Sequence, residues 1–138
     1  MIAHCEWKGN GFFEGQSGSG YTLEFDVDPA HSQGASPMEA VLMGLCGCTS
    51  ADVVSILEKK RQPLTGLRVT ARATRAESAP RVFTEIKLTY TVSGAVSRKA
   101  VEDAVGLSKN KYCPVSKMLE KTAKIDCEIV YVDGELEP

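Results

Sequence analysis

Apolar and polar residues alternate along the first part of the chain with the period of two that is typical of a half-buried β-strand. The alternation occurs in three segments, and glycine-rich turn signals separate them at 9–11 and 17–20. Such turns join neighbouring antiparallel strands. We therefore predict a β-meander with strands at Ile2–Trp7, Phe12–Gln16 and Tyr21–Val27.

The pattern changes at Ser36, which begins a long helix. Ser36 is the expected N-cap, Pro37 occupies the first helical position, and Glu39 completes a capping box. The segment 40–51 carries no charge on any face, so we expect the first half of a helix over 36–60 to be buried on all sides. In so small a protein, that burial is easier if a second subunit helps to cover the helix.

The remainder of the chain predicts further strands and helices. Segments rich in Val, Thr and Ile predict two strands, a helix begins at Ser97 and ends near Asn110, and a second helix begins at Cys113. The expected strands are Leu67–Arg75, Phe83–Val92 and Ile125–Val132, and the last helix runs to about Ala123. The order βββ-α-ββ-αα-β indicates an α+β fold with a largely antiparallel sheet, in one domain over residues 1–138.

Composition and charge narrow the classes of function. The 138 residues contain 16 Lys and Arg against 18 Asp and Glu, a net charge of −2, so no basic surplus indicates nucleic acid; five lysines between 109 and 124 are read as a solvated helix face. The N-terminus lacks a signal-peptide pattern, and the apolar run Ala40–Cys48 is short for a membrane span. We expect a cytoplasmic protein without membrane contact, whose five cysteines stay reduced.

Cys46 and Cys48 do not form a metal-ligand pair on a helix. Two residues turn the helix by about 200°, so their side chains leave on nearly opposite faces. The chain has only two histidines, and no metal site is expected. Cys46 is predicted to be a core residue, whereas Gly44, one turn before Cys48, either makes room above the Cys48 thiol or allows close helix packing.

Cys113 occupies a different position, at the start of the last helix. Pro114 at the first helical position makes Cys113 the N-cap, where free N–H groups and the helix dipole favour a thiolate. Lys111 and Lys117 add positive potential. The alternative is a cysteine that simply replaces a capping serine. If Cys48 and Cys113 meet in the fold, they make a redox couple; Cys5 and Cys127, on predicted strands, are expected in the core.

Together these motifs resemble the OsmC/Ohr family, the osmotically inducible protein C and organic hydroperoxide resistance proteins. The resemblance rests on Ser-Pro-x-Glu at 36–39, Cys-Thr-Ser at 48–50 and Cys-Pro-Val-Ser-Lys at 113–117, and it extends over the whole chain. It implies an intertwined homodimer in which antiparallel sheets are packed on long central helices.

The resemblance also implies an activity, that of a thiol-dependent peroxidase of the oxidative stress response. In such an enzyme the Cys48 thiolate attacks an organic hydroperoxide, an alcohol leaves, and Cys48 becomes a sulfenic acid. Cys113 resolves it as a disulfide, and a dithiol such as a lipoylated protein restores the thiols. No cofactor is implied.

One part of the family pattern is absent. Family peroxidases use an N-terminal arginine held by a glutamate directly after the helix proline. Here Met38 follows the proline, Glu39 comes one residue later, and residues 1–60 contain no arginine. Lys111, or Lys8 of the partner subunit, is the expected substitute, and Met38 and Glu39 are further candidates for a role in supporting Cys48. The sequence thus indicates a divergent OsmC-like branch, and the alternative function is a non-catalytic dimer that binds a small apolar ligand near Cys48.

Overall fold

A computed structural model describes residues 1–134 of the chain. The elements follow the predicted order: β1 (Ala3–Gly9), β2 (Phe12–Ser17), β3 (Thr22–Asp26), α1 (Pro37–Lys59), β4 (Leu64–Arg75), β5 (Phe83–Gly94), α2 (Arg98–Leu107), a short π-helix η1 (Ser108–Tyr112), α3 (Pro114–Leu119) and β6 (Lys124–Val132). The chain divides into two compact units, Met1–Leu42 and Met43–Pro138. That residues 1–138 act as one domain stays a prediction.

The first unit contains the predicted β-meander. Its three strands pair antiparallel in the order β1-β2-β3. Aromatic residues face one another across the strands, with Phe13 opposite both Trp7 and Phe25, and such cross-strand pairs stabilise a sheet. Gly9 and Asn10 adopt positive φ in the first turn, which explains the turn signal in the sequence.

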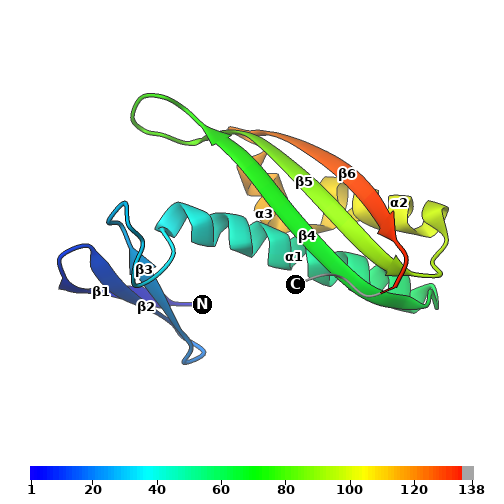
Figure 1. The fold of residues 1–138 in the computed structure, drawn as a ribbon, viewed down its shortest axis with the longest axis horizontal. Coiled ribbons are helices and arrows are strands. Elements are labelled where there is room, and N and C mark those ends of the chain that lie inside the picture. The colour runs from blue at the N-terminus through cyan, green and yellow to red at the C-terminus, as the bar shows by residue number, and fades with distance from the viewer. Residues whose placement is uncertain (135–138) are drawn as a thin grey trace. The chain divides into compact units, whose positions relative to one another are not determined.

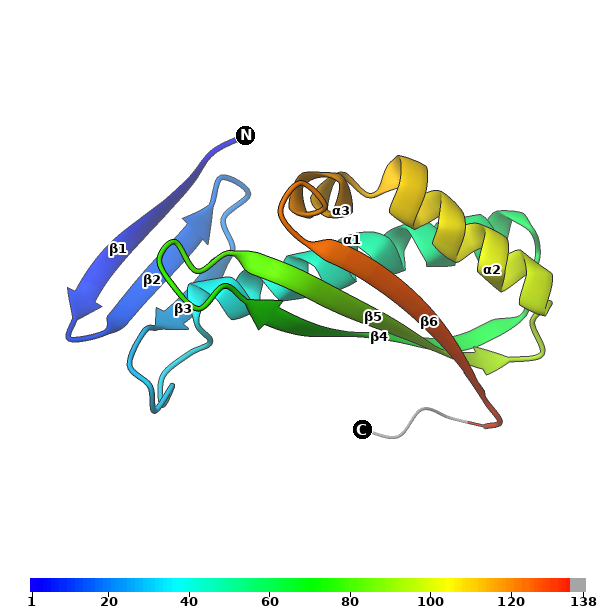
Figure 2. The ribbon, with the colours of Figure 1, turned by 90° about the horizontal axis from the view of Figure 1, so that it is seen from above.

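The second unit is built on the sheet β4-β5-β6. Strands β4 and β5 pair antiparallel, but β6 runs parallel to β5. The expected largely antiparallel pairing is confirmed for β1–β2, β2–β3 and β4–β5. The β5–β6 edge is the exception, because the crossover through α2 and α3 returns the chain in the same direction. The part of α1 that belongs to this unit lies along one face of the sheet, with α2 and α3 beside it on the same face (Figures 1 and 2).

Helix α1 begins with the predicted capping box. The backbone N–H of Glu39 donates to Ser36 Oγ at 3.1 Å, and the backbone N–H of Ser36 donates to Glu39 Oε1 at 2.9 Å. Downstream, the buried residues of α1 are spaced four apart and so form one face of the helix: Leu45, Thr49, Val53 and Leu57. This face supplies the core beneath the sheet.

The other faces of α1 stay open in a single chain. Val41 is 38% exposed and Met43 is 53% exposed, so the expectation of burial on all sides is wrong within one chain. By length and composition α1 would suffice to cross a membrane, which the short run 40–48 did not predict. Its buried face is nevertheless that of a core helix packed on its own sheet.

The segment between β5 and β6 differs from the expected pair of helices. Ser97 caps α2 as predicted, accepting from the Ala100 backbone N–H at 3.3 Å. However, α2 ends at Leu107, and the π-helix η1 follows it directly. Helix α3 ends at Leu119 and does not extend to residue 123 as predicted. The spacing of hydrophobic residues does not predict a π-helix as short as η1, which has 5 residues.

Candidate functional site

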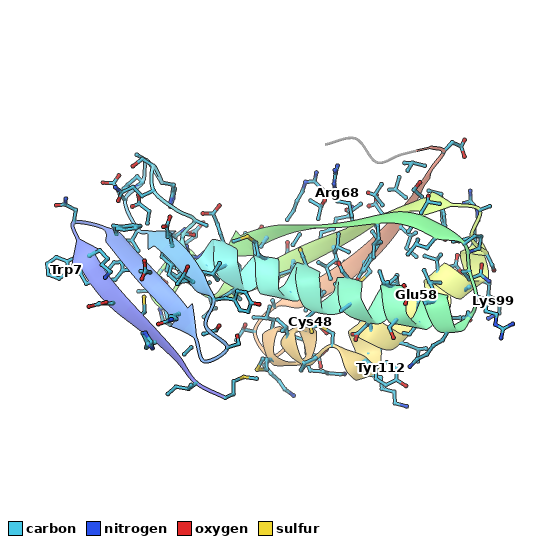
Figure 3. The ribbon with its side chains drawn as sticks, turned by 90° about the horizontal axis from the view of Figure 1, so that it is seen from below. Trp7, Cys48, Glu58, Arg68, Lys99 and Tyr112 are labelled. Atoms are coloured by element: carbon cyan, nitrogen blue, oxygen red, sulfur yellow. The ribbon has the colours of Figure 1, made fainter. Side chains whose placement is uncertain are left out.

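The two cysteines highlighted by the sequence lie in the second unit, one on α1 and one at the start of α3. Cys48 is half-buried in the middle of α1, beside α3 (Figure 3). Cys113 is completely buried and is the N-cap of α3, where its Sγ accepts from the Ser116 backbone N–H at 3.4 Å. The predicted capping role of Cys113 is confirmed.

The fold brings these two thiols together. The Cys48 thiol lies close enough to the Cys113 side chain and to the Val115 backbone N–H for both groups to affect its pKa. Both cysteines are free, as are the other three. The two thiols are thus neighbours in the fold, although they are 65 residues apart in sequence.

The surroundings of Cys48 favour the neutral thiol. Burial raises the pKa of the Cys48 thiol, and the Cys113 side chain raises it further. The Val115 backbone N–H opposes these effects, and the negative charge of Asp52 adds to them. Because the thiolate is the reactive form, Cys48 attacks slowly at neutral pH unless another group assists it.

This environment predicts the pH dependence of Cys48 alkylation. The ordinary pKa of a cysteine thiol is about 8.5, and the Cys48 thiolate should form only at higher pH. The rate of reaction of Cys48 with iodoacetamide should therefore still increase with pH in the range where the rate of an ordinary thiol has become constant. Asp52→Asn removes one repulsive charge and should increase the rate at pH 8 by about two- to threefold. Peptide-resolved alkylation measures this, with Cys5 as the exposed reference; an unchanged Asp52→Asn profile would contradict the assignment.

The residues expected to assist Cys48 have other partners. Glu39 completes the capping box, and its hydrogen bonds with Ser36 lower the pKa of its carboxyl group; Met38 is its neighbour in the first turn. Lys111 Nζ lies 5.2 Å from the centre of the Tyr112 ring. Lys8 pairs with a neighbouring carboxylate, Glu6, at 3.0 Å. A supporting role for Met38, Glu39 and Lys111 stays a prediction.

The other three cysteines differ from one another. Cys5 is exposed, so its predicted core position is wrong: the first unit has a single sheet, which buries few of its side chains. Cys46 and Cys127 are half-buried, and burial raises the pKa of both thiols. No group of His, Cys, Asp or Glu suited to a metal ion occurs in the described part of the chain.

A buried chain of hydroxyl groups lies beside the cysteine pair, and the sequence did not reveal it. Thr49 Oγ1 is 2.7 Å from Tyr90 Oη and 2.8 Å from Ser108 Oγ. Ser108 Oγ in turn donates to Asp52 Oδ2 at 2.8 Å. These groups come from α1, β5 and η1, so only the fold could assemble them.

A cavity of about 480 Å³ opens beside the same helix. Asp52, one helical turn after Cys48, is part of its lining, which combines apolar side chains with two lysines. Its lining residues are Asp52, Ser55, Ile56, Lys59, Lys60, Leu107 and Tyr112. This mixture suits a small molecule with an apolar body and a polar end.

Comparisons with known proteins agree with this architecture. The sequence profile of the family described as OsmC-like protein matches residues 30–128. Protein YhfA of Escherichia coli (strain K12) is 43% identical over 126 residues, covering 91% of this chain and 93% of YhfA. A hypothetical protein from Aquifex aeolicus VF5 is 28% identical, with a TM-score of 0.86 and 97% of each chain covered.

A more distant solved structure bears a functional name. The organic hydroperoxide resistance protein OsmC from Legionella pneumophila is 13% identical to this chain, with a TM-score of 0.71 over 94% of this chain and 97% of the other. At that identity the match shows a shared fold.

Proposed function

The chain belongs to the OsmC-like family, and from that membership we propose that it is a thiol-dependent peroxidase that reduces organic hydroperoxides. One observation carries the proposal: the fold places the Cys113 side chain close enough to Cys48 to raise the pKa of its thiol. A structural role would not require two free thiols on separate elements to meet. The functional name of the Legionella pneumophila relative supports the same class of reaction.

The more accessible thiol takes the attacking role. Cys48 is half-buried, whereas Cys113 is completely buried, so a hydroperoxide reaches Cys48 first. The Cys48 thiolate attacks the terminal peroxide oxygen, the O–O bond breaks, and the alkoxide takes up a proton to leave as an alcohol. Cys48 is then a sulfenic acid. The cavity lined in part by Asp52 offers apolar surface for the organic part of the substrate.

Cys113 completes the oxidative half of the cycle. Its sulfur attacks the sulfenic sulfur of Cys48, the S–O bond breaks, and water leaves as the disulfide forms. An external dithiol, such as a lipoylated protein, then exchanges with the disulfide and restores both thiols while it becomes oxidised itself. No cofactor takes part in these steps.

We also place the protein in the cytoplasm as a homodimer. The free state of all five cysteines fits a reducing compartment. The exposed side chains of Val41 and Met43 lie on a helix that is apolar on every face in this region, and a second copy would remove that surface from water. The intertwined arrangement expected from the family would cover it.

Cys113→Ser tests the proposed cycle. Without the resolving thiol, one equivalent of cumene hydroperoxide should leave Cys48 as a sulfenic acid that dimedone traps, and steady-state turnover with dihydrolipoamide should fall by about tenfold or more. Cys127→Ser, which removes another half-buried thiol, is the control and should retain turnover. Full turnover by Cys113→Ser would contradict the two-cysteine mechanism.

One observation favours a second function, the binding of a small apolar ligand near Cys48 without catalysis. Two groups act electrostatically on Cys48, namely Cys113 and Asp52, and the charged form of each is negative. Both raise the pKa of the Cys48 thiol, and burial raises it as well. Such an environment stabilises a resting thiol. A protein of this kind would bind its ligand with Cys48 unmodified, and stoichiometric hydroperoxide would leave its mass unchanged.

A further inference from the structure

The buried hydroxyl chain beside the cysteine pair has a fixed direction. An ionised carboxylate only accepts hydrogen bonds, so Ser108 Oγ donates its single hydrogen to Asp52, at 2.8 Å. Ser108 must then accept from Thr49, at 2.8 Å. Thr49, having used its own hydrogen, accepts from Tyr90, at 2.7 Å. Thr49 and Ser108 thus each donate and accept, and the chain runs from the Tyr90 donor to the Asp52 acceptor.

This chain is enclosed by the protein. Thr49 is 1% exposed, and both Tyr90 and Ser108 are completely buried. Burial also raises the pKa of the Tyr90 phenol, so Tyr90 stays a donor throughout the working pH range. These three hydroxyl groups are out of contact with solvent, and a buried polar group left without a partner is costly.

Ser108 links this network directly to Cys113. It is the first residue of η1, and its backbone carbonyl accepts from the Cys113 backbone N–H at 2.8 Å. Its side chain is held by Thr49 and Asp52, which follow Cys48 on α1 by one and four residues. A single residue therefore ties the backbone of Cys113 to the turn of α1 that carries Cys48.

The segment that connects α2 to Cys113 is a π-helix, η1. A π-helix has poorer intrinsic stability than an α-helix and commonly occurs at functional sites. Here the wider turn of η1 ends at Cys113, and its first residue is anchored in the core. The chain thus adopts an uncommon local structure at the point where one of the two thiols must be placed.

We propose that Ser108 is a positioning residue for disulfide formation, because its buried hydroxyl group fixes η1 against α1 and so holds Cys113 beside Cys48. This role rests on the proposed function for its biological meaning, but it concerns the thiol pair itself. Removing the hydroxyl group should widen the range of positions that Cys113 samples. The effective concentration of one thiol at the other should then fall.

The test is the equilibrium between the protein and a glutathione redox buffer. In it the Cys48 and Cys113 thiols and glutathione disulfide give the protein disulfide and two reduced glutathione molecules, so no hydroperoxide is needed. Peptide mapping of the full-length protein measures the fraction with a Cys48–Cys113 bond. Ser108→Ala should lower the equilibrium constant about tenfold, which is about 30 mV in reduction potential.

Matched variants separate positioning from other effects. Ser50→Ala removes a hydroxyl group whose hydrogen bond stays within α1, to the Cys46 carbonyl, and should leave the equilibrium unchanged. Because Ser108 is completely buried, Asp52→Ala and Asp52→Asn provide a second comparison. Both remove the charge, but only asparagine keeps an acceptor for Ser108, so the alanine variant should have the lower equilibrium constant.

The outcomes distinguish this inference from the proposed function. The positioning role would be overturned if Ser108→Ala left the equilibrium constant unchanged or raised it, and if Asp52→Ala and Asp52→Asn had the same equilibrium constant. This holds even if the protein reduces hydroperoxides. The expected shifts in a protein that ignores hydroperoxides would support the positioning role and overturn the peroxidase.

Discussion

Cys48→Ser should abolish organic hydroperoxide reduction, with turnover of cumene hydroperoxide lowered by about 1,000-fold or more. A hydroxyl group is a far weaker nucleophile than a thiolate and forms no sulfenic acid, so the proposed reaction loses its first step. Peroxide consumption in the presence of dihydrolipoamide measures the effect. It is the largest effect that the proposed function predicts.

Cys46→Ser is the matched control for this prediction. Cys46 lies two residues away on the same helix and is also half-buried, but the pKa of its thiol is affected by the backbone of Ala71 and not by Cys113. We expect Cys46→Ser to retain turnover within about threefold. Equal losses in the two variants would indicate damage to α1 and would contradict a specific role for Cys48.

Leu45→Ala should destabilise the protein by about 2–5 kcal/mol, the largest stability effect that we predict. Leu45 is completely buried on the face of α1 that packs beneath the sheet. Truncation removes apolar contacts and leaves a cavity that the surrounding core fills only in part. Urea unfolding at a fixed protein concentration measures the change in the free energy of unfolding.

Leu45→Met is the control, because it nearly conserves the volume and should cost less than about 1.5 kcal/mol. A loss below about 1 kcal/mol in Leu45→Ala would show that this face of α1 is not the core of the second unit. The same variant should slow disulfide formation only through global unfolding, since Leu45 makes no hydrogen bond to the hydroxyl chain.

Much of the fold could be predicted from local sequence signals. The capping box at Ser36 and Glu39 and the turn at 9–11 are encoded in adjacent residues, so the sequence places them closely. The parallel pairing of β5 and β6 could not be predicted in this way, because strand direction depends on how α2 and α3 return the chain. The exposure of α1 likewise depends on what surrounds it, which a helical pattern does not contain.

In the candidate site, too, local sequence signals predicted some of the residues and not others. Position on a helix identified Cys113 as an N-cap, and the motif resemblance identified Cys48. Local sequence did not single out Cys48 as the proposed attacking thiol, because burial and Asp52 raise the pKa of Cys48 instead of lowering it. Ser108 was missed because a serine in a polar segment has no distinguishing pattern until Thr49 and Asp52 face it.

The central claim is that Cys48 and Cys113 form a peroxide-driven disulfide. The most direct measurement is the intact mass of the denatured, alkylated protein after treatment with stoichiometric cumene hydroperoxide, followed by peptide mapping, with hydrogen peroxide as the comparison. We predict the loss of two hydrogens, mapped to a Cys48–Cys113 bond and formed faster with the organic oxidant. An unchanged mass after several minutes, with both thiols fully alkylated, would contradict the peroxidase and favour ligand binding.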